Sequence, residues 1–293
     1  MENYLGQYIA YLQEEKKTSG NTTAAYKRDL DKLVFFLEEH GITDWKKVSF
    51  TLLNSYILEL ERNGAASATV SRNVSTIKSY FSYLFHMKLI DNEPSLNLKA
   101  PKITRKVPEI LSIEEMDRLL DTPDLTTPKG IRDKAMLELL YATGIKVTEV
   151  ISLKVSDINM AMNFITCMDG KKGRMIPFGR PAAKAISEYL TKVRPEMAAK
   201  DSDLLFVNCN GLGMSRQGFW KIIKGYGEIC GFADRLTPHT FRHSFAAHMI
   251  LNGADLKSVQ EMLGHSDIST TQVYTSFMNS GINSVYANTH PRK

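Results

Sequence analysis

Cysteines and long apolar runs are scarce in this sequence of 293 residues, and each shortage excludes a class of protein. The three cysteines, Cys167, Cys209 and Cys230, are odd in number and widely spaced, which excludes a disulfide framework and a zinc motif. No apolar run approaches the roughly 18 residues of a transmembrane helix, and the first residues lack the pattern of a signal peptide. We therefore expect a cytoplasmic protein without a membrane partner.

The proportions of charged and hydrophobic residues, in contrast, are ordinary for a globular protein. Hydrophobic residues make up 43% and charged residues 24% of the chain, which excludes disordered, collagen-like and low-complexity proteins. At roughly 100–200 residues per domain, the length predicts two domains, each with its own core. The formal net charge of +5 permits a nucleic-acid partner without proving one.

The first part of the chain has the apolar spacing of helices. Apolar residues recur every three or four positions around residues 4–12, 26–37, 52–60 and 70–84. A cap at Asn21 to Thr23 begins the second of these segments, and Gly41 ends it. The pattern predicts an all-helical N-terminal domain over residues 1–104.

Basic residues lie on two of these helices and in the segment that follows them. Prolines interrupt the pattern between residues 91 and 108, which indicates an extended linker. Cations next to hydroxyl and amide groups are typical of phosphate contacts, although solvated helix faces and a plain spacer are the alternatives. The candidate DNA-binding residues are Lys27, Arg28, Arg72, Lys78, Lys99, Lys102, Arg105 and Lys106.

The remaining residues, 105–293, predict a mixed domain that is mostly helical with a small antiparallel sheet. Ser112 to Glu115 is a typical capped helix start, and a long helix over 130–142 ends at Thr143-Gly144. Alternating residues at 164–168 and 174–177, with a turn over 169–173, predict a β-hairpin. The whole chain is therefore expected to be mainly α-helical.

One segment, Thr237 to Ser244, carries side chains suited to phosphoryl chemistry. His239 and Arg242 are three residues apart, so on a helix they would share a face. A histidine can move protons while a fixed guanidinium holds oxyanions. Gly264-His265 and Tyr274 follow, although each of these signals is weak when taken alone.

In this order, the motifs resemble those of the tyrosine recombinases, the lambda-integrase and Xer family of site-specific DNA recombinases. His239-x-x-Arg242, Gly264-His265 and Tyr274 resemble the C-terminal signature of the family, and residues 142–153 resemble its first catalytic box. The similarity covers essentially the whole chain and favours the compact Xer type. It implies a helical core-binding domain followed by a catalytic domain.

The resemblance implies a catalytic role for each matched residue. Tyr274 would attack the scissile phosphate and form a 3′-phosphotyrosine, which keeps the bond energy, so neither a metal nor another cofactor is required. Arg242 and His265 would stabilise the negative charge of the transition state. His239 would take up the proton of the tyrosine.

The resemblance also assigns residues in the hairpin and in the first box. Lys171, in the hairpin turn, would protonate the leaving 5′-oxygen, with its neighbour Lys172 as the alternative. Lys172 is otherwise a candidate DNA-binding residue. Glu149 would orient the catalytic residues without contacting the phosphate itself.

One position, Lys146, departs from the family pattern, which has arginine there. Lysine keeps the positive charge but loses the planar fork that binds phosphate through two hydrogen bonds. Losing one transition-state contact of this kind costs roughly 10²–10³ in rate, so we expect reduced activity. The substitution is either engineered or natural, and the sequence leaves both explanations open.

Taken together, the resemblance implies a recombinase that acts on duplex DNA sites. Four protomers on two sites would exchange strands through a Holliday junction, and the need for a partner recombinase stays open. Lys146 favours one rival, a catalytically impaired DNA-binding relative. The other rival is a nicking enzyme similar to type IB topoisomerases.

Overall fold

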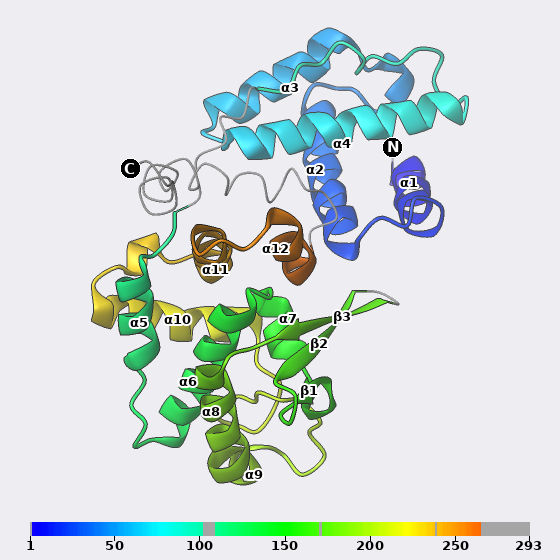
Figure 1. The fold of residues 1–293 in the computed structure, drawn as a ribbon. Helices are drawn as coiled ribbons and strands as arrows, with labels where there is room; N and C mark the ends of the chain where they lie inside the picture. Colours follow the sequence, from blue (N-terminus) through cyan, green and yellow to red (C-terminus); the bar gives the residue numbers. More distant parts are fainter. Residues whose placement is uncertain (1, 102–108, 170–171, 238, 265–293) are drawn as a thin grey trace, which may run out of the picture. The chain divides into compact units, whose positions relative to one another are not determined.

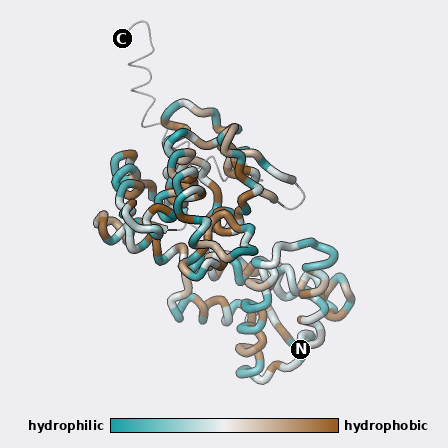
Figure 2. Tube along the Cα trace, turned by 90° about the horizontal axis from the view of Figure 1, so that it is seen from below, coloured by the Kyte–Doolittle hydropathy of each residue, from teal (hydrophilic) through white to brown (hydrophobic). Residues whose placement is uncertain are grey.

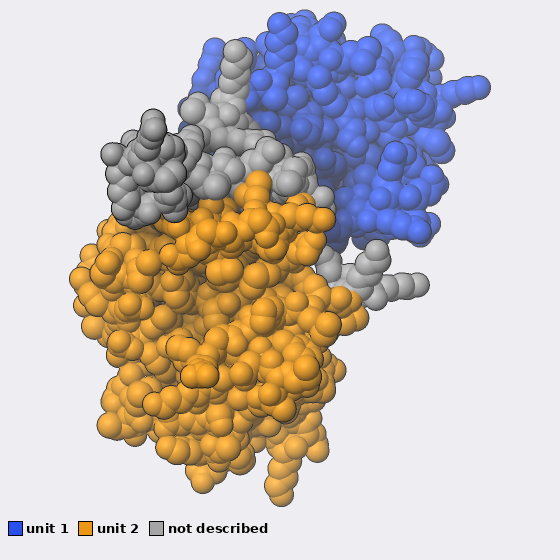
Figure 3. Space-filling model, in the orientation of Figure 1, with its two compact units in different colours: residues 1–106 blue, residues 107–293 orange. Residues whose placement is uncertain are grey.

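The computed structural model describes residues 2–101, 109–169, 172–237 and 239–264. The chain divides into two compact units, Met1–Lys106 and Val107–Lys293 (Figures 1 and 3). Within the described ranges, no helix is both long and apolar enough to cross a membrane. The predicted fold class is confirmed: the chain is mostly helical and has one small antiparallel sheet in the second unit.

The first unit consists of helices. They are α1 (Glu2–Glu14), α2 (Gly20–Glu39), α3 (Phe50–Arg62) and α4 (Ser67–His86), with a short 3-10 turn at Trp45–Lys47. All four helices lie where the apolar spacing predicts them. The cap of α2 differs from the prediction, because Ser19 rather than Asn21 accepts a hydrogen bond from the backbone N–H of Thr22, at 3.2 Å.

The core of the first unit is rich in aromatic rings. Tyr8, Tyr80 and Phe81 are fully buried, and the rings of Tyr8 and Tyr80 meet edge to face with centroids 5.0 Å apart. Trp45 packs on Tyr80 from the connection between α2 and α3. Brown apolar and teal polar stretches alternate along these helices in Figure 2, as expected for helices that each bury one face.

The second unit begins with a helix pair and continues through a sheet into further helices. Its α-helices are α5 (Ile113–Asp121), α6 (Pro128–Thr143), α7 (Val147–Ser152), α8 (Arg180–Glu188), α9 (Arg194–Met197), α10 (Arg216–Cys230), α11 (Thr240–Leu251) and α12 (Leu256–Leu263). Short 3-10 turns lie at Val155–Asp157 and Ala233–Arg235, and a π-helical stretch at Tyr189–Val193 joins α8 to α9. The predicted capping box at Ser112 is confirmed.

The sheet has three antiparallel strands in the order β1–β2–β3. They are β1 (Ile158–Asn159), β2 (Phe164–Asp169) and β3 (Lys172–Pro177). The predicted hairpin is confirmed, but its turn is tighter than the sequence indicates. Pairing continues through Met168 with Gly173 and Asp169 with Lys172, so a turn of five residues, 169–173, is wrong. Strand β1 was not predicted at all.

Candidate active site

Arg242, in the first turn of α11, connects the predicted motifs. Its side chain is buried, and its two Nη atoms donate hydrogen bonds to the carbonyl oxygens of Gly144, at 2.8 Å, and Leu263, at 2.6 Å. Gly144 belongs to the first box, and Leu263 ends the helix that leads to His265. One guanidinium therefore joins three segments that lie far apart in the sequence.

The close packing around Arg242 depends on a glycine. Gly144 ends α6 in the left-handed conformation, with φ of +60°. A Cβ atom at this position would lie only 2.3 Å from the ring of Phe245 and 2.9 Å from Leu263. A larger residue would strain the backbone and separate α6 from α11 and α12.

The first box turns directly from Gly144 into α7, with Lys146 at the cap. The Lys146 side chain is exposed, and its backbone N–H donates a 2.7 Å hydrogen bond to Oε2 of Glu149. Glu149 thus satisfies one of the otherwise unpaired N–H groups at the start of this short helix. The carboxylate fixes the backbone from which the lysine projects.

Arg174 is part of this arrangement, although sequence reasoning missed it. It lies on β3, and its Nη2 atom contacts both carboxylate oxygens of Glu149, at 2.9 and 3.0 Å. Its Nε atom donates to the carbonyl oxygen of Met262, at 3.1 Å. The only signal in the sequence is a cation five residues after the hairpin aspartate, Asp169, which is too common to be informative.

His239 lies next to the other cations but not inside the helix. It is the cap residue directly before α11, and its carbonyl oxygen accepts a 2.8 Å hydrogen bond from the backbone N–H of His243. Partial desolvation and then the charges of Arg242, Arg216 and Lys146 lower the pKa of His239 below 6.5. The three cations give His239 positively charged surroundings, which a phosphate requires.

Three predicted catalytic residues, Lys171, His265 and Tyr274, lie outside the described residues. Lys171 comes immediately before β3, and His265 immediately after Gly264, which ends α12. The structure therefore brings together Lys146, Glu149, Arg242 and His239, together with Gly264, the residue before His265.

Two family models match this sequence. The model of the phage integrase family matches residues 109–279, and the model of the phage integrase N-terminal SAM-like domain matches residues 5–88. The chain belongs to the phage integrase family. Its curated relatives from Oceanobacillus iheyensis and Herpetosiphon aurantiacus carry the name tyrosine recombinase, as the resemblance of the motifs implies.

Two curated relatives match almost the full chain. Tyrosine recombinase XerD of Oceanobacillus iheyensis is 43% identical over 296 residues, with 100% of this chain and 99% of the relative covered. Tyrosine recombinase XerC of Herpetosiphon aurantiacus is 44% identical over 282 residues, with 95% and 92% covered.

A solved structure shows the same fold. It is the XerH site-specific recombinase bound to palindromic difH substrate, in a post-cleavage complex. The TM-score is 0.76 at 21% identity, and the match covers 97% of this chain and 84% of that chain. This likeness supports the fold of the phage integrase family for both units.

A second histidine near the site, His243, provides a test through pH. Burial, followed by the charges of His239 and Arg242, lowers the pKa of His243 from 6.5 to about 4. The unfolded chain therefore binds a proton at this histidine more readily than the folded protein does. The free energy that neutral His243 contributes to stability is complete above pH 6.5 and is lost as pH falls toward 4.

We predict that His243→Gln flattens the loss of stability between pH 6.5 and pH 4, because the variant has no proton to take up. The wild-type protein should lose up to about 3 kcal/mol more over this interval. Urea unfolding at several pH values measures the difference. Parallel curves for the two proteins would contradict a neutral His243.

The candidate DNA-binding residues of the first unit lie in unlike surroundings. Lys27 and Arg28 are exposed on α2, where Lys27 forms an exposed ion pair with Asp31, at 3.3 Å. Arg72 instead makes two hydrogen bonds to the buried carboxylate of Asp29, at 2.8 and 2.9 Å, and ties α4 to α2. This structural role competes with a phosphate contact, because the guanidinium already has an anionic partner.

The other basic candidates are only partly described. Lys78 is half-buried on α4, and Lys99 is exposed at the end of the first unit. Lys172 begins β3. The three remaining linker residues, Lys102, Arg105 and Lys106, lie outside the described residues, and their contact with DNA stays a prediction.

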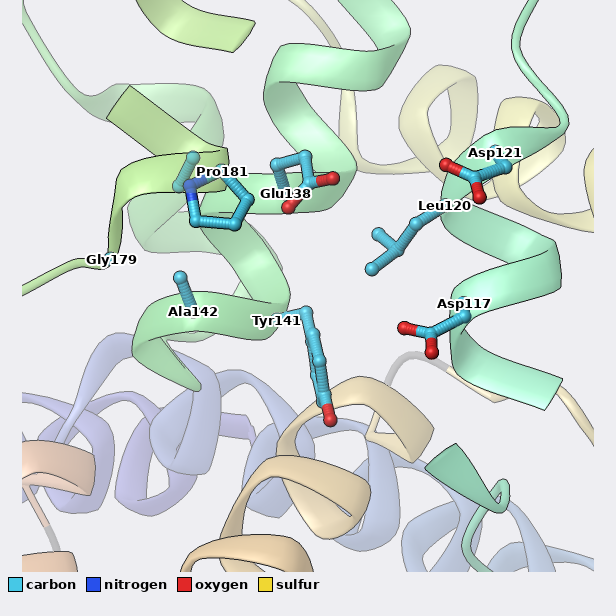
Figure 4. Close-up of a pocket in the computed structure, with 9 residues that line it drawn as sticks. Asp117, Leu120, Asp121, Glu138, Tyr141, Ala142, Gly179 and Pro181 are labelled. Atoms are coloured by element: carbon cyan, nitrogen blue, oxygen red, sulfur yellow. The ribbon is translucent and has the colours of Figure 1, made fainter. Parts of the chain in front are cut away.

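A cavity of about 310 Å³ lies between α5, α6 and α8 (Figure 4). Its lining carries three carboxylates, from Asp117, Asp121 and Glu138, which Figure 4 shows around the opening with the ring of Tyr141. The carboxylates disfavour a phosphate here, and none of the candidate catalytic residues lines the cavity; Ala142, at the start of the first box, is the motif residue that does. The cavity is therefore separate from the candidate active site.

Proposed function

We propose that this chain is a site-specific DNA recombinase that cleaves and rejoins duplex DNA through a 3′-phosphotyrosine intermediate. The observation that carries the proposal is the buried Arg242, which joins the first box and the end of α12 in a chain of this family. A fixed guanidinium of this kind stabilises a phosphorane without reorganisation during the reaction.

In the proposed first step, the hydroxyl oxygen of Tyr274 attacks the scissile phosphorus. A new P–O bond forms to the tyrosine while the bond from phosphorus to the 5′-oxygen breaks. The bond energy stays in the phosphotyrosine, so a free 5′-hydroxyl can later reverse the step without ATP or a metal ion. Rejoining to a different strand gives the Holliday junction.

The negative charge that develops on the non-bridging oxygens has three proposed partners, and a fourth residue takes the proton of the tyrosine. Arg242 and Lys146 attract the non-bridging oxygens, and His265 donates a hydrogen bond to one of them. His239 takes the proton of the tyrosine, a role that its lowered pKa supports, because only neutral imidazole accepts a proton.

The leaving oxygen requires a proton of its own. We assign this step to Lys171, whose ammonium would transfer a proton to the 5′-oxygen. Lys172 is the alternative proton donor. The contacts of Glu149 with the backbone of Lys146 and with Arg174 support its orienting role.

The proposed partners are duplex DNA and further copies of the chain. The solved XerH relative is bound to a recombination substrate, which supports DNA as the partner here. A tetramer on two DNA sites, an optional partner recombinase and a cytoplasmic location belong to the same proposal. The names of the relatives do not favour the rivals, a nicking enzyme and an impaired DNA-binding protein.

The test uses a duplex that carries the sequence that the protein selects from a random pool, with a nick close to the cleavage position. Release of the short fragment traps the covalent intermediate, which a denaturing gel detects. We expect an adduct through the 3′-phosphate and, with two intact sites, exchanged strands. Relaxation of supercoiled DNA without exchange would indicate the nicking enzyme instead.

We predict that neutralising Lys99, Lys102, Arg105 and Lys106 weakens binding to all DNA sequences by similar factors. Each lost phosphate contact should reduce the slope of log affinity against log salt by roughly one. Fluorescence anisotropy at several salt concentrations measures the slope. An unchanged slope would show that the linker is only a spacer.

A further inference from the structure

The guanidinium of Arg174 contacts two elements besides its own strand. Its carboxylate partner, Glu149, lies on α7, and its carbonyl partner, Met262, lies on α12. The side chains of Arg174 and Glu149 are each only 16% exposed, so the pair is protected from most of the screening by water. One residue therefore ties β3 to α7 and α12.

Gly264 adapts the end of α12 to this guanidinium. It ends the helix with φ of +66°, and a Cβ atom there would lie 2.9 Å from both Cζ and Nη1 of Arg174. The side chain of Arg174 thus occupies the space that any larger residue at position 264 would require. His265 is the next residue along the chain.

The outer half of the β2–β3 hairpin depends on few contacts. Strand β1 pairs only with the base of β2, at Phe164 and Ile165. Farther along, Met168 is 61% and Met175 is 71% exposed. Cys167 is buried opposite Arg174, but it is a small side chain without an ionic partner. Arg174 therefore provides the main polar restraint on this part of the hairpin.

The other two elements keep anchors of their own. Val147 and Val150 hold α7 in the hydrophobic core, and the carbonyl of Leu263 at the end of α12 accepts a hydrogen bond from Arg242. Loss of Arg174 should consequently disturb the hairpin more than α7 or α12.

We propose that Arg174 is a positioning residue that fastens the β2–β3 hairpin, and with it Lys171, to the catalytic body. Lys171 precedes β3 directly, so the restraint at Arg174 acts three residues from the proposed proton donor. The inference rests on the proposed function, in which Lys171 Nζ gives its proton to the 5′-oxygen as the bond from phosphorus to that oxygen breaks.

The test compares two leaving groups. One nicked duplex has the ordinary 5′-oxygen at the scissile phosphate, and the other has sulfur in its place, which leaves as a thiolate without a proton. Single-turnover adduct formation is measured for wild type, Arg174→Lys and Arg174→Met. On oxygen we expect a loss of about 10- to 100-fold, because a misplaced general acid contributes little. On sulfur the rates should lie within about threefold of wild type.

The ratio of the two rates within one preparation is the decisive quantity. Partial unfolding lowers both rates equally and leaves the ratio unchanged, so a merely structural role of Arg174 would not alter it. Met175→Ala, an exposed neighbour on the same strand, is the matched control and should keep the wild-type ratio. Lys171→Ala should show the same pattern as the Arg174 variants, with a larger loss on oxygen.

Equal losses on both substrates, or no loss on either, would overturn the role of Arg174 while wild-type cleavage still supports the proposed function. An absence of adduct from the wild-type protein on both substrates would instead contradict the proposed function, and the inference would fall with it.

Discussion

Tyr274→Phe is expected to abolish covalent adducts with DNA while leaving the affinity for DNA almost unchanged. The phenolic oxygen is the proposed nucleophile, and phenylalanine removes that atom alone. Because it forms its bond to phosphorus only during the reaction, it contributes little to binding of the uncleaved duplex. Adduct formation on the nicked duplex and fluorescence anisotropy on an intact one measure the two quantities.

Another tyrosine of the second unit provides the control for this change. Tyr226 is half-buried and donates a 2.9 Å hydrogen bond to Asp133, and neither residue belongs to a motif. Tyr226→Phe should form adducts at the wild-type rate once its folding is checked. Adducts from Tyr274→Phe would show that the last motif is assigned to the wrong residue.

Lys146→Arg is expected to raise the rate of cleavage by roughly 10²–10³, if the restored fork acts as one contact to the developing oxyanion. The exposed Lys146 side chain projects from the fixed start of α7, so the longer guanidinium has room. Affinity should change far less, because both residues carry one positive charge. Single-turnover rates on the nicked duplex separate cleavage from assembly and rejoining.

A lysine outside the site serves as the control for added arginine. Lys154 pairs with Asp203 at 2.7 Å on the surface of the same unit, and Lys154→Arg should leave the cleavage rate unchanged. If Lys146→Arg is no faster than wild type, the lysine is either compensated elsewhere or remote from the phosphate. Combining Lys146→Arg with Arg242→Ala distinguishes these cases. The effects of the two substitutions on the free energy of activation are non-additive if both residues contact one phosphate, and they add if Lys146 is remote.

Much of the fold is predictable because local patterns determine it. The apolar spacing predicts each helix of the first unit, and the serine cap at Ser112 marks the start of α5. Strand β1 has only two residues, so it is too short for any alternation to show. The predicted hairpin turn is too long because lysine and glycine are depleted in strands, whereas cross-strand pairing includes Lys172 and Gly173 in β3.

The candidate site was predicted in part, for a related reason. The resemblance of the motifs assigns Arg242, Lys146 and Glu149 to one site. In the structure, the elements that carry these residues are in contact. Arg174 contacts residues 25 and 88 positions away, so no local pattern could reveal its role. The pairing of Arg72 with Asp29 spans 43 positions and escaped the sequence analysis in the same way.

The most direct measurement of the central claim is the identity of the residue that carries DNA after cleavage. The trapped adduct is digested with a nuclease and a protease, and mass spectrometry locates the remaining nucleotide. The account predicts a nucleotide joined through its 3′-phosphate to the peptide that contains Tyr274. A nucleotide on any other residue, or joined through its 5′-phosphate, would contradict it.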